Sequence, residues 1–409
     1  MKQVPALANQ PAIRLDMTVK PDNDIQYMSI QSLSIVIPCL NESETIGDCI
    51  RNAQKLLAGY SFPGEVIVAD NDSSDGSIEI ARQSGAEVLE VKKKGYGSTL
   101  HQGILNAKSE YIIFADGDGS YRFDEARLFI DAFSQGFEVV IGNRFKGGIE
   151  KNAMPFLHRF LGTPILSMLG KRSFHVELGD FNCGMRGIKK STYEKLDMKS
   201  EGMEYATEFI AKASYKNCRI KEVPIKLYKD GRSGGSHLKT WSDGWKHLKL
   251  ILLLSPRWFL LYPALFFFII GSLLGVSLSF NKIEFSHIVL DIHTLYFCSV
   301  FLVISLTFLE FYYMVNYYGM SLGIYPRAGL TEWISRHLNF EKGLLIGLLL
   351  FIIGVGLSAS AVFRWYRLSF QNLNPQEIFR IIIPGGFCMI VGLQLVVFSF
   401  FLTMIKSNH

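Results

Sequence analysis

Paired cysteines and a strong charge of one sign are both missing from this sequence. Its six cysteines are scattered along 409 residues, and no two of them form a C-x-x-C pair. This pattern indicates neither a zinc site nor a disulfide framework, so a reducing compartment is the expectation. Lys and Arg number 42 against 37 Asp and Glu, a net charge of +5 with no long basic run. We therefore expect no nucleic-acid partner.

The first 30 residues lack an apolar run, and the chain lacks two common nucleotide-binding motifs. We expect a loosely ordered tail over residues 1–30 and no signal peptide. Gly95-Tyr96-Gly97 begins like G-x-G-x-x-G, but residue 100 is Leu and the glycines follow the third predicted strand instead of the first. The dinucleotide fingerprint therefore fails, and no Walker A pattern is present.

From residue 33 onward, short apolar runs alternate with amphipathic stretches. We predict strands over residues 33–38, 65–70, 86–91, 111–116 and 137–142, and helices over residues 43–57, 77–84, 98–107 and 124–135. Continuous apolar strands separated by helices are typical of a parallel sheet covered by helices on both faces. The expected fold class is α/β with a mostly parallel, Rossmann-like sheet.

Polar side chains follow three of these predicted strands. The first strand runs into PCLNE (residues 38–42), the second into DNDSSDG (residues 70–76) and the fourth into Asp116-Gly117-Asp118. Parallel strands bring their carboxyl ends to one edge of the sheet, where ligands bind in open α/β folds. Two carboxylates beside a glycine suit a divalent cation that also binds phosphate oxygens. Each segment alone could instead be a capping turn.

The order and spacing of four segments resemble the inverting family 2 glycosyltransferases with a GT-A fold: VIPCLNES, VADNDSSDGS, FADGDGS and IGNRFKGG. Three later segments resemble the branch that loads hexoses onto polyprenyl phosphates, which includes dolichol-phosphate mannose synthases and bacterial polyprenyl-phosphate glucosyltransferases. These segments are LGDFNCGMRG, GMEYATEFIAKASYKNCRIKEVPI and GRSGGSH. The resemblance spans residues 33–250.

The resemblance implies a site for a nucleotide sugar, a metal and a lipid phosphate. The nucleotide-sugar pocket would be lined by Pro38, Asn41, Glu42, Asp70, Asp72 and Asp116. Asp116 and Asp118 would form the Asp-X-Asp motif that holds Mg²⁺ or Mn²⁺, with Asp118 the more direct ligand. Arg144 would face the reaction centre. The acceptor phosphate would meet Arg144, Arg159, Arg232 and Ser236.

This sequence departs from the family pattern at two positions. The second acidic position of the Asp-Asp motif is Asn71, and the basic position after the Ser of the R-x-x-x-S-K pattern is His237. A processive polysaccharide synthase is the rival within the family. Such synthases carry Gln-x-x-Arg-Trp before the membrane, whereas Leu254 occupies the Gln position before Arg257-Trp258.

Residues 155–174 are apolar on most sides yet contain basic side chains. The segment could be a buried helix pair with snorkelling basic residues. It could also be a loop that dips to the membrane surface and meets the phosphate of the lipid.

Long apolar runs are concentrated towards the C-terminus. Four of them reach the roughly 20 residues that cross a bilayer: residues 258–280, 294–318, 343–363 and 381–405. Residues 238–254 place Trp and Leu on one helical face and Lys off it, which suits a helix lying in the membrane interface. We expect a tail over 1–30, a GT-A domain over 31–237, this interfacial helix over 238–256 and a four-span domain over 257–409.

An even number of spans places both ends of the chain on one side of the membrane. Without a signal peptide, that side should be the cytoplasm, and the protein a multi-pass protein of the cell membrane. Glu310 is the one charged residue within the four apolar runs. An intramembrane carboxylate can be functional, but an interfacial or helix-packing role fits its position equally well.

The expected reaction is transfer of a hexose, with inversion, from a UDP-glucose- or GDP-mannose-type donor to a polyprenyl phosphate for cell-envelope glycan or glycoprotein assembly. A phosphate monoester is already anionic at neutral pH, with a second pKa of about 6, so a strong general base is unnecessary. The alternatives are a processive synthase, a non-catalytic nucleotide-sugar-binding membrane partner and a regulated channel. The sequence leaves the sugar, the nucleotide, the metal and any homo-oligomer open.

Overall fold

A computed structural model describes residues 29–233, 240–321, 325 and 329–407. The chain forms two compact units, Met1–Ile251 and Leu252–His409. The boundary falls inside a helix that begins at Thr240, so the predicted helix between the domains belongs mostly to the first unit.

The first unit is built on a seven-stranded sheet with the order β3-β2-β1-β4-β6-β5-β7. Every neighbouring pair is parallel except the two that involve β6, which runs antiparallel to β4 and to β5. The α/β prediction of a mostly parallel sheet is therefore confirmed. The strands are β1 (Leu33–Cys39), β2 (Gly64–Asp70), β3 (Glu87–Glu90), β4 (Tyr111–Phe114), β5 (Val139–Asn143), β6 (Arg186–Lys189) and β7 (Ile220–Pro224).

Several helices of the first unit pack against this sheet, α3 and α4 among them. A Cβ on Gly103 would lie 2.6 Å from the Val36 side chain, so α3 crosses β1 closely. A Cβ on Gly187 would lie 2.6 Å from the Phe133 ring, which brings α4 equally close to β6. The helical segments are α1 (Ile46–Ala58), α2 (Ser77–Gln83), α3 (Tyr96–Asn106), η1 (Phe123–Glu125), α4 (Arg127–Ser134), α5 (Arg144–Gly147), η2 (His158–Gly162), α6 (Thr163–Phe174), α7 (Lys190–Leu196), α8 (Tyr205–Tyr215) and α9 (Thr240–Leu254).

All five predicted strands are present, but two further strands of this sheet were not predicted. β6 reads RGIK and β7 reads IKEVP, and neither contains a continuous apolar run. β6 is stabilised through Arg186, whose fully buried guanidinium donates to the carbonyl oxygens of Cys183 (2.9 Å), Phe181 (2.8 Å) and Ala206 (2.6 Å). A buried arginine that binds only carbonyls has no hydrophobic signature in the sequence.

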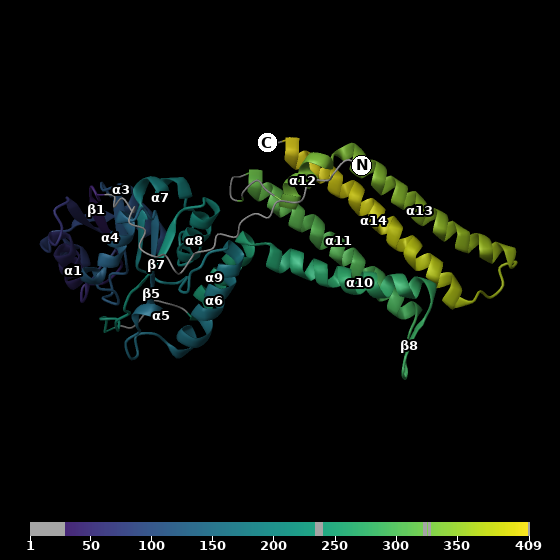
Figure 1. Cartoon of the computed structure of the whole chain (residues 1–409), viewed down its shortest axis with the longest axis horizontal. Helices are drawn as coiled ribbons and strands as arrows, with labels where there is room; N and C mark the ends of the chain where they lie inside the picture. Colours follow the sequence, from purple (N-terminus) through teal and green to yellow (C-terminus); the bar gives the residue numbers. More distant parts are fainter. Residues whose placement is uncertain (1–28, 234–239, 322–324, 326–328, 408–409) are drawn as a thin grey trace, which may run out of the picture. The chain divides into compact units, whose positions relative to one another are not determined.

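The second unit contains long helices that pack as two hairpins, α10 with α11 and α13 with α14 (Figure 1). Among the described residues, four segments are long and apolar enough to cross a membrane: 257–280, 292–321, 340–367 and 375–406. The four predicted spans are therefore confirmed. The elements are η3 (Arg257–Leu261), α10 (Tyr262–Phe280), β8 (Ile283–Phe285), β9 (Ile288–Leu290), α11 (Ile292–Ser321), α12 (Gly329–His337), α13 (Phe340–Arg367) and α14 (Pro375–Ser407).

Small residues bring α13 and α14 together. A Cβ on Gly347 would lie 2.6 Å from the Gly392 carbonyl oxygen, and a Cβ on Gly354 would lie 2.5 Å from that of Gly385. Backbones approach this closely in membrane helix pairs that associate through small residues. Between α11 and α14, Gln394 Nε2 donates to Thr307 Oγ1 at 2.7 Å. One turn further along α11, Glu310 Oε1 is buried without a hydrogen-bond partner among the described residues.

Candidate active site

Three parallel strands deliver the predicted site residues to one edge of the sheet. β1 lies between β2 and β4, and its last residue Cys39 pairs with Asp70, the last residue of β2. β4 ends at Phe114, and Ala115 and Asp116 follow directly. The carboxyl ends of these strands therefore meet, as the sequence predicted for a ligand-binding edge.

Asp116 and Asp118 differ in their surroundings. Asp116 accepts a hydrogen bond from the Tyr96 hydroxyl (2.8 Å), and burial, followed by the charge of Asp118, raises the pKa of its carboxyl above the ordinary value. Asp118 binds the Ser120 backbone N–H through Oδ1 (2.9 Å) and Arg232 through Oδ2 (3.2 Å). Both residues are partly exposed, so either carboxylate can meet a ligand at this edge. The role of Tyr96 was not predicted, because its segment read only as a failed glycine fingerprint.

Arg232 is the central cation of this site. Its Nη1 lies 3.0 Å from Glu42 Oε1, its Nη2 lies 3.2 Å from Asp118 Oδ2, and its Nε lies 3.0 Å from both carboxylate oxygens of Asp230. The side chains of Arg232, Glu42 and Asp118 are each 15% exposed or less. Burial raises the pKa of Glu42 to about 7, although the charge of Arg232 opposes that shift. The sequence pattern placed Arg232 near the lipid acceptor but did not predict its contact with the Asp-X-Asp motif.

The segment that carries Arg232 is fastened to the Asp-X-Asp loop through the backbone. Tyr228 N–H donates to the Ser120 carbonyl and Gly231 N–H donates to the Asp118 carbonyl, each at 3.0 Å. A Cβ on Gly231 would lie 2.8 Å from Thr45 Cγ2, so this position needs a glycine. These bonds set where the guanidinium of Arg232 lies.

Asp70 shapes the loop after β2. Its Oδ1 accepts from the backbone N–H groups of Asp72 and Ser73, both at 2.9 Å, and its Oδ2 accepts from the Ser73 hydroxyl at 2.5 Å. Asp70 is 1% exposed. The Asp70 carboxylate therefore stabilises this loop. A hydrogen bond between Asp70 and a nucleotide would have to form alongside these internal bonds.

Asn71, which stands where the family pattern has an acidic residue, makes contacts that a carboxylate could not make. Asn71 Nδ2 donates to the carbonyls of Val91 and Lys93, both at 2.9 Å, and its Oδ1 accepts from the Gly95 backbone N–H at 2.8 Å. A carboxylate could accept from Gly95 but could not donate to either carbonyl. An amide is therefore the side chain that joins the loop after β2 to the entry of α3.

Three other predicted nucleotide-pocket residues lie at this edge in different settings. Pro38 is in β1 and Asn41 follows that strand with a left-handed backbone (φ 57°). Asn41 Oδ1 accepts from the Ser74 N–H at 2.9 Å, which joins the loops after β1 and β2. Asp72 points away from this buried network, because its side chain is 75% exposed and pairs with Lys94 at 2.5 Å.

Arg144 is buried and paired. Asp180, fully buried, accepts from Arg144 Nε at 2.7 Å and from Nη2 at 2.8 Å. This leaves the Nη1 side of the guanidinium as the part that could reach a ligand. Asp180 lies inside the LGDFNCGMRG segment, but its partner is 36 residues away, so sequence spacing alone gave no sign of the pair.

Two acceptor candidates remain, and the structure describes only one of them, Arg159, which makes no contact with this network. Arg159 lies on η2, exposed, with its guanidinium 5.5 Å from the centroid of the Phe160 ring. Ser236 lies outside the described residues. Both stay predictions for the acceptor phosphate.

The donor set fits a cation that is shared with a substrate. Among the described residues, no group of three or more His, Cys, Asp or Glu side chains is placed to hold a metal ion. One or two carboxylates together with phosphate oxygens are the usual protein contribution to a Mg²⁺ site. Asp118 and Asp116 supply such a partial site.

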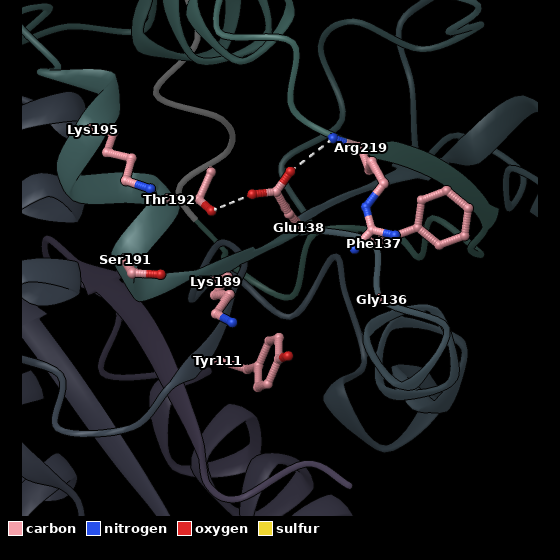
Figure 2. Close-up of a pocket in the computed structure, with 9 residues that line it drawn as sticks. All are labelled: Tyr111, Gly136, Phe137, Glu138, Lys189, Ser191, Thr192, Lys195 and Arg219. Carbon is pink, nitrogen blue, oxygen red and sulfur yellow. Dashed lines mark hydrogen bonds between the residues drawn. The ribbon is translucent and has the colours of Figure 1, made fainter. Parts of the chain in front are cut away.

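A separate pocket lies at the opposite edge of the sheet (Figure 2). It has a volume of about 200 Å³ and contains Tyr111, at the start of β4, and Glu138, just before β5. Glu138 is held by the Thr192 hydroxyl (2.9 Å) and the Arg219 N–H (3.1 Å). Glu138 is the one carboxylate among the residues that line this pocket, and it already has two hydrogen-bond partners. The pocket therefore has no equivalent of the Asp-X-Asp motif.

Residues 34–197 match the family described as Glycosyl transferase family 2, and residues 313–406 match its C-terminal transmembrane region. The chain belongs to glycosyltransferase family 2. It is therefore a multi-pass membrane protein with an N-terminal catalytic domain, as the sequence predicted.

The family 2 assignment is accompanied by similarity to individual proteins. The low-salt glycan biosynthesis hexosyltransferase Agl6 of Haloferax volcanii is 29% identical over 95% of this chain and 91% of its own length. A dolichyl-phosphate hexose transferase of the same organism is 27% identical over 53% of this chain and 90% of its own. A solved glucosyl-3-phosphoglycerate synthase from Mycobacterium tuberculosis overlaps 56% of this chain and 79% of its own, with 17% identity and a TM-score of 0.42.

Proposed function

We propose that this family 2 glycosyltransferase moves a hexose from a nucleotide-diphosphate sugar to a polyprenyl phosphate, with inversion at the anomeric carbon. The observation that carries the proposal is the contact of Arg232 with Asp118 and Glu42 at the carboxyl edge of the sheet, in a chain with four membrane spans. The similarity to a protein named dolichyl-phosphate hexose transferase supports the lipid-phosphate acceptor.

The donor would bind where the loops after β1, β2 and β4 meet. We expect Asn41, Glu42 and Asp70 to contact the nucleoside, and Asp116 and Asp118 to lie beside the diphosphate, because these residues end or follow β1, β2 and β4. A bound Mg²⁺ or Mn²⁺, held by Asp118 and Asp116, would neutralise charge on the departing diphosphate.

In the reaction, an oxygen of the acceptor phosphate attacks the anomeric carbon and forms the new C–O bond. The bond between that carbon and the diphosphate oxygen breaks, and the nucleoside diphosphate leaves with the electron pair. Because the phosphate monoester is already anionic, the protein must chiefly align the two substrates. No proton has to be removed from the nucleophile.

Arg232 and Arg144 are the proposed contacts for the acceptor phosphate. A guanidinium can bind two phosphate oxygens at once, which fixes direction as well as charge. Arg144 is held in place by Asp180, so it would meet the phosphate as a preorganised group through Nη1. Arg232 lies beside Asp118, where it can contact charge on either substrate.

The proposal is tested with purified full-length protein, a polyprenyl phosphate and a panel of labelled UDP- and GDP-hexoses, followed by lipid extraction. One donor should label the lipid in a reaction that a chelator stops and Mg²⁺ or Mn²⁺ restores. Asp118→Asn should lose at least about a hundredfold in rate, the scale for removing a preorganised charge-stabilising group. Asp48→Asn is the control, since Asp48 is 72% exposed in a surface pair.

Two results would contradict the proposal. Full activity in chelator would remove the metal from the mechanism. Failure of every donor to label the lipid, with the folded protein confirmed by circular dichroism, would contradict the acceptor itself.

A further inference from the structure

One segment of the catalytic unit carries a cluster of exposed large apolar side chains. Phe156 is 74% exposed, Phe160 60% and Leu161 53%, and their neighbours on the same side are similarly open. We call this surface the apolar patch and define it by Phe156, Leu157, Phe160, Leu161, Ile165 and Met168. Large contiguous apolar patches on soluble domains mark sites of interaction with proteins, membranes or ligands.

The patch is the outer face of a helix whose inner face is well packed. Residues 157, 161, 165 and 168 recur at helical spacing along η2 and α6. On the inner side, Ser167 Oγ accepts from the Phe181 N–H at 3.1 Å, and a Cβ on Gly170 would lie 2.5 Å from the Phe181 ring. The helix is therefore anchored to the unit, and the exposure of its outer face is not a sign of loose packing.

Elsewhere in the described part of this unit, the large exposed apolar residues do not form such a run. Leu40, Leu105, Leu128, Phe145 and Trp245 are 39%, 38%, 42%, 39% and 60% exposed, and each lies on a different element or loop. Single exposed apolar residues of this kind are ordinary. The patch differs because six large side chains lie within 13 residues.

The charge of the segment indicates the chemistry of its partner. Residues 151–176 contain four Lys or Arg and no Asp or Glu. Arg159 and Arg172 are exposed on the patch segment itself. Apolar residues bordered by Lys and Arg are typical of helices that lie in the headgroup region of an anionic bilayer.

We propose that the apolar patch inserts into the interface of the lipid bilayer and holds the catalytic unit on the membrane surface. The occupant is the bilayer because this chain is an integral membrane protein and the patch is basic as well as apolar. Of the two sequence interpretations of residues 155–174, this proposal favours the membrane-contacting segment. A second copy of the chain and its own membrane unit are the competing occupants, and both are protein surfaces.

The patch is linked to the proposed active site through covalent connection and one ion pair. The chain leaves the sheet after β5 at Arg144, forms η2 and α6, and returns at Asp180 before β6. The Arg144–Asp180 pair closes the base of this excursion. Docking of the patch would therefore fix the position of Arg144 relative to the headgroup layer, where a lipid phosphate arrives.

The test is the depth of a nitroxide label in the full-length protein reconstituted in vesicles with anionic lipid. Labels are placed at Phe156→Cys and, independently, at Phe160→Cys, in a background without Cys218 and Cys388. Leu128→Cys on α4 is the matched control, since Leu128 is an exposed apolar residue outside the patch. Collisions with oxygen, which enriches in the bilayer, are compared with collisions with a water-soluble nickel complex.

The ratio of oxygen to nickel collisions should be several-fold higher at residues 156 and 160 than at residue 128. An equal ratio at all three sites would place the patch in water and overturn the proposal. Low collision rates with both reagents would show a protein partner instead, which also overturns it. The measurement needs no substrate, so its outcome is independent of whether polyprenyl phosphate is the acceptor.

Discussion

At the residue scale, the site contains more carboxylates than cations, and one arginine contacts three of these carboxylates. Glu42, Asp118 and Asp230 all contact Arg232, and the charge of Asp118, together with burial, raises the pKa of the neighbouring Asp116. Bringing several carboxylates together in a partly buried site is costly unless cations compensate them. Such a site is prepared to accept a divalent cation and the phosphates that accompany it.

Arg232→Lys tests the proposed role of this arginine at the acceptor phosphate. A lysine keeps the charge but cannot bind two oxygens in a fixed plane, so transfer should fall by roughly tenfold or more, the value of one charged hydrogen bond. The apparent affinity for polyprenyl phosphate should weaken, while calorimetry should show nearly unchanged nucleotide-sugar binding. Arg82→Lys, in an exposed pair with Glu90, is the control.

The opposite pattern is also informative. Weakened nucleotide binding with unchanged lipid dependence would assign Arg232 to the diphosphate of the donor instead of the acceptor.

At the element scale, the strands that carry the site could be predicted and the strands that complete the sheet could not. β1, β2 and β4 are apolar runs that are followed by polar residues, and this pattern can be recognised in the sequence alone. β7 is an edge strand in which Val223 alone is buried, and β6 is four residues long with Arg at its start. Contacts such as Tyr96 with Asp116 depend on this assembled sheet, so no local pattern reveals them.

The hairpin of α13 and α14 offers a matched pair of glycines. Gly347→Ala would place a Cβ 2.6 Å from the Gly392 carbonyl oxygen, whereas a Cβ on Gly356 meets nothing within 4 Å. Overpacking costs typically about 1–3 kcal/mol. Gly347→Ala should therefore lower the thermal unfolding midpoint in detergent, measured by circular dichroism, and Gly356→Ala should not. Equal midpoints for the two variants would show that the close α13–α14 contact does not limit stability.

At the scale of the whole molecule, the catalytic unit is predicted to face the cytoplasm, and the even number of spans would place the C-terminus on the same side. Lys229→Cys, on an exposed part of the catalytic unit, should resist a membrane-impermeant maleimide in intact cells and react after the cells are opened. Strong labelling in intact cells would reverse the topology. The α/β domain and the spans were both predictable, because alternating apolar segments indicate the first and long apolar runs indicate the second. No comparable sequence pattern indicates where the site lies relative to the bilayer.

The most direct test of the account compares a polyprenyl phosphate with the polyprenol of the same chain length, using the donor that the panel identifies. The account predicts a product of one hexose on one lipid, formed only from the phosphate, because only the phosphate is anionic without a general base. Mass spectrometry of the extracted lipid would show that single addition. Transfer to the polyprenol, or a long glycan chain in place of one hexose, would contradict the proposed reaction.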